Sequence, residues 1–191
     1  MIALVDYGAG NLFSVSNALE VIGAEFKVVD SAFEASEYSG VLLPGVGHFG
    51  QMMRSLDDRG LCTSLGSAVE KGVPLLGICL GMQALFETSE EARGVSGLRI
   101  LRGSVVEISG EVRVPQIGWN EVRFDDRDPM WFYFANSFVV KDSEAVWGRC
   151  EYGGEFSAAV KQGSIWGMQF HPEKSGTAGL GLLKEWIDYA G

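Results

Sequence analysis

Residues 73–86 read Val-Pro-Leu-Leu-Gly-Ile-Cys-Leu-Gly-Met-Gln-Ala-Leu-Phe. The part before Cys79 is an apolar run of strand length, and the part after it has the spacing of a helix. Gly77 and Gly81 lie two positions before and two positions after the cysteine. A sharp turn needs small residues there, because the backbone passes close to its own strand and helix. The stretch therefore predicts a strand, a tight elbow that carries Cys79, and a helix.

Cys79 is a candidate nucleophile. A cysteine at the start of a helix lies near unpaired backbone N–H groups, and these favour the thiolate over the thiol. The alternative is a buried cysteine that acts as a small apolar residue. The elbow alone does not decide between the two.

A second segment supplies a candidate base. Residues 164–173 read Ser-Ile-Trp-Gly-Met-Gln-Phe-His-Pro-Glu. His171 and Glu173 are two residues apart, so in an extended chain they point the same way. A histidine that takes the Cys79 proton, and that a carboxylate holds in one tautomer, is the arrangement of an activated nucleophile. We therefore expect Cys79, His171 and Glu173 to form a catalytic triad, although His-Pro-Glu alone is also compatible with a surface turn.

A third segment, residues 41–50, is a buried strand run that ends in a glycine-rich loop. Acyl chemistry at a thiolate creates an oxyanion, which backbone N–H groups can stabilise. We expect these donors in the loop Gly45, Val46 and Gly47, together with the N–H of Leu80. An ordinary turn after a strand has the same pattern.

Two further polar side chains lie close to these segments. Gln83 follows Cys79 by one helical turn and can contact the amino or carboxylate group of a bound amino acid, or it is a surface amide. His48 has no carboxylate two residues away, and we expect it in a loop without a catalytic role.

Composition limits the class of protein. The 191 residues suit a single domain, and 15 basic against 25 acidic residues give a net charge of −10, which disfavours nucleic acid or an anionic membrane as partner. Without a signal-peptide pattern or an apolar run of membrane length, a cytoplasmic location is expected.

The three cysteines, Cys62, Cys79 and Cys150, are odd in number and without C-x-x-C spacing, which predicts neither disulfides nor a zinc site. The Gly8-x-Gly10 pair has Phe13 where a dinucleotide fingerprint needs a third glycine, so no nicotinamide site is expected.

The order of apolar patterns predicts an α/β fold. In the first half, strands are expected at 2–6, 25–30, 41–43 and before Cys79, and helices at 14–22, 61–69 and after Cys79. Such alternation predicts a parallel sheet covered on both faces, with its site at the carboxyl ends of the strands. In the second half, strands are expected at 105–108, 121–124, 131–134, 138–140, 146–152, 157–161 and 165–170, before a final helix at 179–189. These strands should be antiparallel and should extend the first sheet or pack beside it.

Three segments together resemble a known family. Residues 77–83, 44–47 and 169–173 are similar to the motifs of class I, triad-type glutamine amidotransferases. The resemblance narrows, through residues 6–11, 118–120 and 171–175, to the glutaminase subunits of imidazole glycerol phosphate synthase. It covers nearly the whole chain, from Ile2 to the last helix.

The resemblance implies one domain, residues 1–191, with a three-layer, flavodoxin-like fold and no cofactor. It implies that glutamine is hydrolysed to glutamate and ammonia at Cys79, and that the substrate contacts include Gln83, Ser137 and Phe138. It also implies a heterodimer with a (β/α)₈-barrel cyclase subunit, which converts PRFAR and ammonia to imidazole glycerol phosphate and AICAR in histidine biosynthesis. The residues expected at that interface are Asn11, Trp119, Asn120, Tyr133 and Lys174. The chain has no phosphate-binding G-x-x-x-x-G-K motif, which agrees with an acceptor site on another subunit.

Three positions depart from the family pattern. Asn136 and Phe138 replace the usual His and Tyr, and Gln116 replaces a common His. These changes leave the triad intact and alter side chains that the family pattern places at the glutamine contact and at the coupling to the partner. The alternatives are a glutaminase of the pyridoxal phosphate, anthranilate or amidino-sugar pathway, a cysteine hydrolase without a partner, and an inactive binding subunit.

Overall fold

The computed structural model describes residues 1–9 and 11–191, so Gly10, part of the Gly8-x-Gly10 pair, lies outside the described residues. Its α-helices are α1 (Leu12–Val21), α2 (Phe49–Asp58), α3 (Leu61–Glu70), α4 (Leu80–Ala84) and α5 (Gly176–Ala190). Its 3₁₀ turns are η1 (Ala35–Glu37), η2 (Glu90–Ala92) and η3 (Pro172–Lys174). Its strands are β1 (Ile2–Val5), β2 (Phe26–Val29), β3 (Gly40–Leu43), β4 (Leu75–Ile78), β5 (Thr88–Ser89), β6 (Ser104–Glu107), β7 (Gln116–Phe124), β8 (Met130–Asn136), β9 (Phe138–Val140), β10 (Val146–Glu151), β11 (Glu155–Gln162) and β12 (Ile165–Met168).

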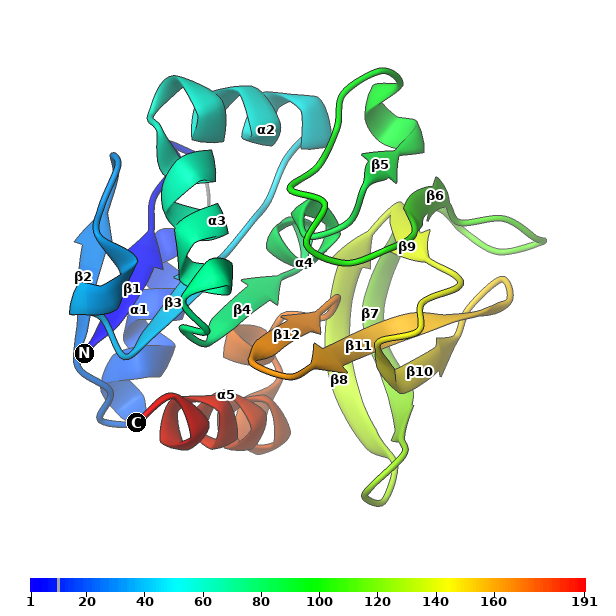
Figure 1. The fold of residues 1–191 in the computed structure, drawn as a ribbon. Coiled ribbons are helices and arrows are strands. Elements are labelled where there is room, and N and C mark those ends of the chain that lie inside the picture. Colours follow the sequence, from blue (N-terminus) through cyan, green and yellow to red (C-terminus); the bar gives the residue numbers. More distant parts are fainter. Residues whose placement is uncertain (10) are drawn as a thin grey trace.

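One sheet runs through the molecule in the order β2-β1-β3-β4-β12-β11-β10-β7-β8, with β5, β6 and β9 attached at its side (Figure 1). The strands from β2 to β12 pair in parallel, and those from β12 to β8 pair antiparallel. The expectation of an α/β fold, in which antiparallel strands of the second half extend a parallel sheet, is confirmed.

Helices cover both faces of the parallel part (Figure 1). Ala3 and Val5 of β1 pack with the core formed under α2 and α3, whereas Ile2 and Leu4 pack with the core formed under α1 and α5. This alternation follows from the two-residue period of a strand. Burial on both faces explains why these strands are continuous apolar runs.

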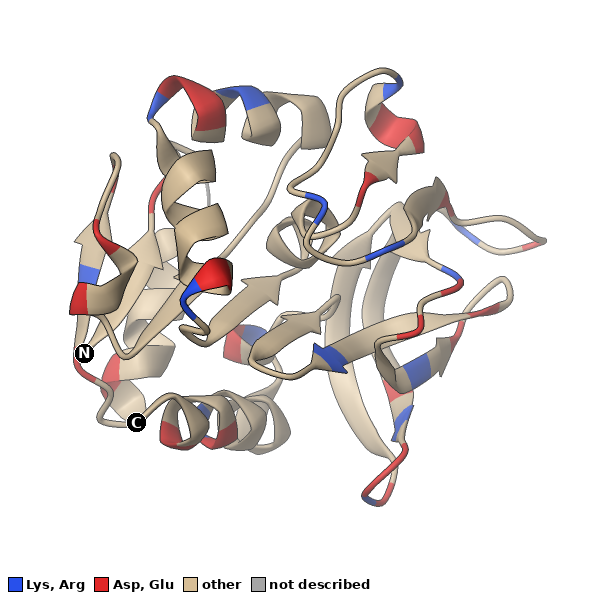
Figure 2. Ribbon diagram, viewed as in Figure 1, with Lys and Arg blue, Asp and Glu red and all other residues tan. Residues whose placement is uncertain are grey.

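Charged residues lie mainly on helix exteriors and in loops, and the parallel strands are almost free of them (Figure 2). In the described part of the chain, no helix is long and apolar enough to cross a membrane.

The structure differs from the sequence expectations at α2, β7 and β12, and it adds the short strand β5. Helix α2 was not expected, because the glycines around it obscured its start, which His48 caps by accepting a hydrogen bond from the Gly50 N–H. Strand β7 begins at Gln116, five residues before the expected start at residue 121. Strand β12 pairs in parallel with β4 rather than only antiparallel with β11, because the β11–β12 hairpin returns it beside β4 in the direction of β4.

Candidate active site

Cys79 lies at the junction of β4 and α4 in a backbone conformation that side chains rarely adopt, with φ 54° and ψ −112°. The glycines on both sides are there because there is no space for a Cβ. A Cβ on Gly81 would lie 1.9 Å from the Leu43 carbonyl oxygen, and one on Gly77 would lie 2.6 Å from the Gly81 carbonyl oxygen. The elbow is thus held by close backbone packing between β3, β4 and α4, and Cys79 has a strained backbone of the kind that clusters at functional sites.

The β4–β12 pair brings the second segment to the elbow. Ile78 and Met168 are partners in the register, and the Cys79 N–H donates to the Met168 carbonyl at 2.7 Å. Three residues further along, the His171 N–H donates to the Tyr133 carbonyl of β8 at 2.9 Å. Ser175 closes this link, because its hydroxyl donates to the His171 carbonyl and accepts from the Tyr133 N–H. His171 is therefore held on both sides of its backbone.

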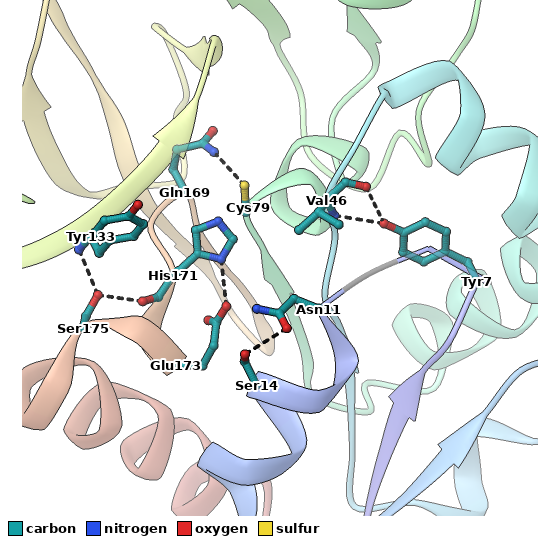
Figure 3. Close-up of polar contacts among 10 residues, drawn as sticks. All are labelled: Tyr7, Asn11, Ser14, Val46, Cys79, Tyr133, Gln169, His171, Glu173 and Ser175. Atoms are coloured by element: carbon teal, nitrogen blue, oxygen red, sulfur yellow. Dashed lines mark hydrogen bonds and ion pairs between the residues drawn. The ribbon is translucent and has the colours of Figure 1, made fainter. Parts of the chain in front are cut away.

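The side chain of His171 lies between Cys79 and Glu173 (Figure 3). Its Nδ1 is 2.8 Å from the Glu173 Oε1, and the two side chains are only 4% and 1% exposed. Burial disfavours a charge on the ring, but hydrogen bonding and charge interaction with Cys79 and Glu173 outweigh burial and raise the pKa of His171 to about 10. The ring can therefore carry a proton at neutral pH beside the Cys79 sulfur.

Two of the four expected oxyanion donors, the N–H groups of Leu80 and Val46, are engaged in other hydrogen bonds in this structure. The Leu80 N–H donates to the Gly45 carbonyl at 3.3 Å. The Val46 N–H donates to the Tyr7 hydroxyl at 3.0 Å, and the same hydroxyl donates to the Val46 carbonyl at 2.9 Å (Figure 3). Gly47 has φ 95° and open space around its Cβ position. The loop thus lies beside Cys79 with the Gly45 carbonyl, rather than an N–H, turned to α4.

A cavity of about 300 Å³ opens in front of Cys79. It contains most of the side chains that the sequence singled out, and its lining is Val46, Gly47, Cys79, Leu80, Gln83, Glu91, Pro115, Ala135, Asn136, Ser137, Phe138, His171 and Lys174. A free α-amino acid fits a site of this size and polarity. Asn136, one of the departures from the family pattern, donates through Nδ2 to the Phe138 carbonyl at 3.0 Å, whereas Gln116 is fully buried and does not line the cavity.

The residues expected at a partner interface do not form one cluster. Trp119 is 50% exposed on β7, packs edge-on against Tyr133 with 6.3 Å between ring centroids, and Tyr133 in turn lies 6.0 Å from the Lys174 ammonium. Asn11 precedes α1 and accepts a hydrogen bond from Ser14. Asn120 alternates with Trp119 along β7 and therefore faces the other side of the strand, where it is half-buried opposite Phe132.

Sequence reasoning missed three residues of the site, namely Tyr7, Gln169 and Ser175. Each lies inside a segment with a recognised motif, but its hydrogen-bond partner lies far away in the sequence. Tyr7 is 39 positions from Val46, and Gln169 is 90 positions from Cys79. No local pattern gives such contacts.

Comparison with known proteins agrees with this fold. Residues 3–187 match the family model for glutamine amidotransferase class-I. The imidazole glycerol phosphate synthase subunit HisH of Moorella thermoacetica is 43% identical, with 100% of this chain and 97% of that protein covered. The subunit of the same name from Geobacillus kaustophilus is 42% identical, with the same coverage. The solved structure of PurLQS from Thermotoga maritima has a TM-score of 0.79 at 20% identity, with 100% of this chain and 98% of that chain covered, which is a likeness of fold.

The fold and the site define a class I glutamine amidotransferase, and the chain belongs to that family. Within the family, its full-length similarity groups it with the HisH subunits of imidazole glycerol phosphate synthase. The resemblance stated from the motifs is confirmed.

Proposed function

We propose that this chain hydrolyses L-glutamine to glutamate and ammonia, and that it supplies the ammonia to the cyclase subunit of imidazole glycerol phosphate synthase. The observation that carries the proposal is the placement of His171 between Cys79 and Glu173, in a chain that is similar over its whole length to HisH subunits. The proposed unit is the single domain formed by residues 1–191, and its location in the cytoplasm stays a prediction.

The chemistry follows from the geometry. The Cys79 thiolate attacks the side-chain carbonyl carbon of glutamine, and His171 donates its proton to the departing ammonia. The product of this step is a glutamyl thioester on Cys79. His171, now neutral, takes a proton from water, the hydroxide attacks the thioester, and the thiolate leaves as glutamate forms. Glu173 keeps the imidazole in the orientation that both steps need.

Both tetrahedral intermediates carry an oxyanion that needs backbone donors. With the Leu80 N–H on the Gly45 carbonyl and the Val46 N–H on Tyr7, those donors are engaged in other bonds. A flip of the peptide between Gly45 and Val46 would release the first donor and direct the second toward Cys79. Losing one oxyanion donor costs roughly 10² to 10³ in rate, so this flip is an effective switch.

The proposed partner is the (β/α)₈-barrel cyclase, which forms a heterodimer with this chain and holds the acceptor PRFAR. Ammonia released into neutral water becomes ammonium, a poor nucleophile, so hydrolysis should wait for a loaded partner. Support for a contact face comes from the exposed aromatic side chains of β7 and β8 beside the triad segment. The interface residues proposed are Asn11, Trp119, Asn120, Tyr133 and Lys174.

The decisive experiment measures glutamate release by the free chain, by the complex, and by the complex with PRFAR. We expect weak activity alone and strong stimulation in the loaded complex. Cys79→Ala should abolish glutamine-dependent turnover of the complex but leave synthesis from added ammonium salts. A free chain that runs at the full rate, or a Cys79→Ala complex that still uses glutamine, contradicts the proposal.

A further inference from the structure

A chain of buried amides leads to the side of the Cys79 sulfur that faces away from Glu173 (Figure 3). The Gln169 Nε2 is 3.7 Å from the Cys79 Sγ, within hydrogen-bond distance for sulfur. The Gln169 Oε1 accepts from the Gln83 Nε2 at 2.9 Å, and the Gln83 Nε2 also donates to the Phe138 carbonyl at 2.9 Å. Gln169 is fully buried and Gln83 nearly so.

The direction of these bonds is fixed by one group that cannot change its role. The Phe138 backbone carbonyl can only accept, so the Gln83 atom beside it must be the nitrogen. That nitrogen has a second proton, so the Gln169 atom that it meets must be the oxygen. The other end of the Gln169 amide is then the NH₂ group, and this group faces the sulfur. Asn136 also donates to the Phe138 carbonyl, which holds that acceptor in place.

We propose that Gln169 stabilises the Cys79 thiolate by donating an N–H···S hydrogen bond, and that Gln83 holds Gln169 in the donating orientation. The inference rests on the proposed function, because it takes Cys79 as the nucleophile. A donor to sulfur favours the anion over the thiol, since a hydrogen bond to a charged acceptor is about twice as strong as one to a neutral acceptor. Gln83 also lines the cavity, so one side chain contributes to both the substrate site and the nucleophile.

Other charged or titratable groups around the sulfur must be kept constant in a test. His171 faces it from the segment after β12, with Glu173 behind the ring, and Tyr7 faces it from the end of β1. Glu91 and Lys174 line the same cavity. None of these is changed by a substitution at Gln169, so a change in thiolate formation reports on the amide.

The test is the pH dependence of Cys79 alkylation by iodoacetamide in the full chain, from about pH 4 to about pH 9, without glutamine. Mass spectrometry of the peptide with Cys79 separates its reaction from that of Cys62 and Cys150. Gln169→Met keeps the volume and removes the donor, and the half-maximal pH should rise by about one unit, a tenfold loss of thiolate at a given pH. Gln116→Met is the matched control, because Gln116 is an equally buried glutamine that does not line the cavity and that lies beside Cys150 rather than Cys79. An equal half-maximal pH in wild type, Gln169→Met and Gln116→Met overturns the proposal.

Gln83→Met tests the orienting role of Gln83. It removes the donor to the Gln169 Oε1, so the Gln169 amide is no longer held with its NH₂ group on the sulfur, and the half-maximal pH of Cys79 alkylation should rise. In the Gln169→Met background the same substitution should have a smaller effect on that pH. Equal effects in both backgrounds would mean that Gln83 acts on the sulfur by another route, which overturns its role in orienting Gln169. If Gln169→Met does not fold, an unchanged half-maximal pH in Gln83→Met overturns the proposal as well.

These outcomes are distinct from failure of the proposed function. A wild-type Cys79 that does not react at any pH contradicts its role as nucleophile. If Cys79 reacts but the half-maximal pH of its alkylation does not depend on Gln169, the glutaminase proposal stands. Only the proposed roles of Gln169 and Gln83 are then overturned.

Discussion

The hydroxyl of Tyr7 makes two hydrogen bonds to Val46, accepting from its N–H at 3.0 Å and donating to its carbonyl at 2.9 Å. Burial is the main cause that raises the pKa of Tyr7 to about 12, so the hydroxyl keeps its proton at neutral pH and can make both bonds. A further contact fixes Tyr7 itself, because the Ser55 hydroxyl of α2 donates to its carbonyl. Tyr7 therefore stabilises the orientation of the loop in which the Val46 N–H is directed away from Cys79.

Tyr7→Phe should raise the glutaminase activity of the free chain. The substitution removes both bonds to Val46 and keeps the packed ring, so the loop reaches the flipped orientation more often. A net hydrogen bond contributes about 1 kcal/mol, so an increase of roughly three- to tenfold in kcat is expected. The measurement is glutamate release without a partner.

Tyr38→Phe is the control for this variant. Tyr38 is also buried, packs edge-on against Phe33 and does not line the cavity, so its hydroxyl should not matter for the rate. If Tyr7→Phe lowers the free rate, or leaves it equal to that of Tyr38→Phe, then Tyr7 does not restrain the loop.

Local patterns explain what the sequence predicted well. Gly77 and Gly81 predicted the elbow because the close approach they permit is within one short segment. The strand positions followed from apolar runs that are buried on both faces. The contact between His171 and Cys79 depends instead on the parallel pairing of β12 with β4, which no short pattern specifies. It was inferred from the residue types, which are those of a catalytic pair, and from the resemblance of both segments to one family.

Non-local hydrogen bonds explain what the sequence missed. Tyr7, Gln169 and Ser175 act through partners on other elements, and a polar side chain in a short apolar segment does not indicate which partner it will meet. Likewise, the expected strand at 121–124 left out Trp119 and Asn120, so the sequence did not predict which face of β7 each residue occupies. Its alternation separates exposed Trp119 from half-buried Asn120.

Trp119→Ala should weaken binding to the cyclase subunit. The indole is half-exposed beside Tyr133, and Ile117 and Trp131 on the same face of the β7–β8 pair are 67% and 57% exposed. Large aromatic side chains at the centre of an interface often contribute 2 kcal/mol or more, so Kd should rise by about 30-fold or more. Isothermal titration calorimetry with the purified cyclase measures this change.

Val28→Ala provides the comparison for binding. Val28 is an exposed apolar residue on β2, at the opposite edge of the sheet from β8. The Kd of the Val28→Ala variant for the cyclase should equal that of wild type. Equal affinities for Trp119→Ala and Val28→Ala would remove the β7–β8 face from the interface.

Gly81→Ala should inactivate the enzyme and destabilise the fold. The new Cβ would meet the Leu43 carbonyl at 1.9 Å, and backbone on both sides leaves little room to move. Overpacking of this kind costs about 1–3 kcal/mol or more. Gly66→Ala in α3 meets no atom within 4 Å, and alanine is the better helix former by up to about 1 kcal/mol, so this variant should be at least as stable as wild type. Urea unfolding compares the two, and a stable, active Gly81→Ala would contradict the account of the elbow.

His171 should keep its ring proton well above neutral pH. Burial lowers its pKa, but the contacts with Cys79 and Glu173 raise it from 6.5 to about 10. NMR of the imidazole should therefore show a charged ring at about pH 8, where an unperturbed histidine is neutral. Cys79→Ala removes the sulfur that favours the charged ring, so the midpoint of the His171 titration should move to lower pH.

The same pKa shift makes a prediction for stability. Because the folded-state pKa of His171 lies above its unfolded value, its contribution to stability is fully present below pH 6.5 and is lost as pH rises through about 10. Above about pH 8.5, where the Cys79 thiol of the unfolded chain is ionised as well, the free energy of unfolding of wild type should therefore decline more steeply than that of Cys79→Ala, whose His171 has lost the sulfur that favours the charged ring. Urea unfolding at a series of pH values measures both slopes. Because the thiol of wild type is ionised in both states above about pH 8.5, parallel slopes in that range would contradict a charged pair of sulfur and imidazole in the folded protein.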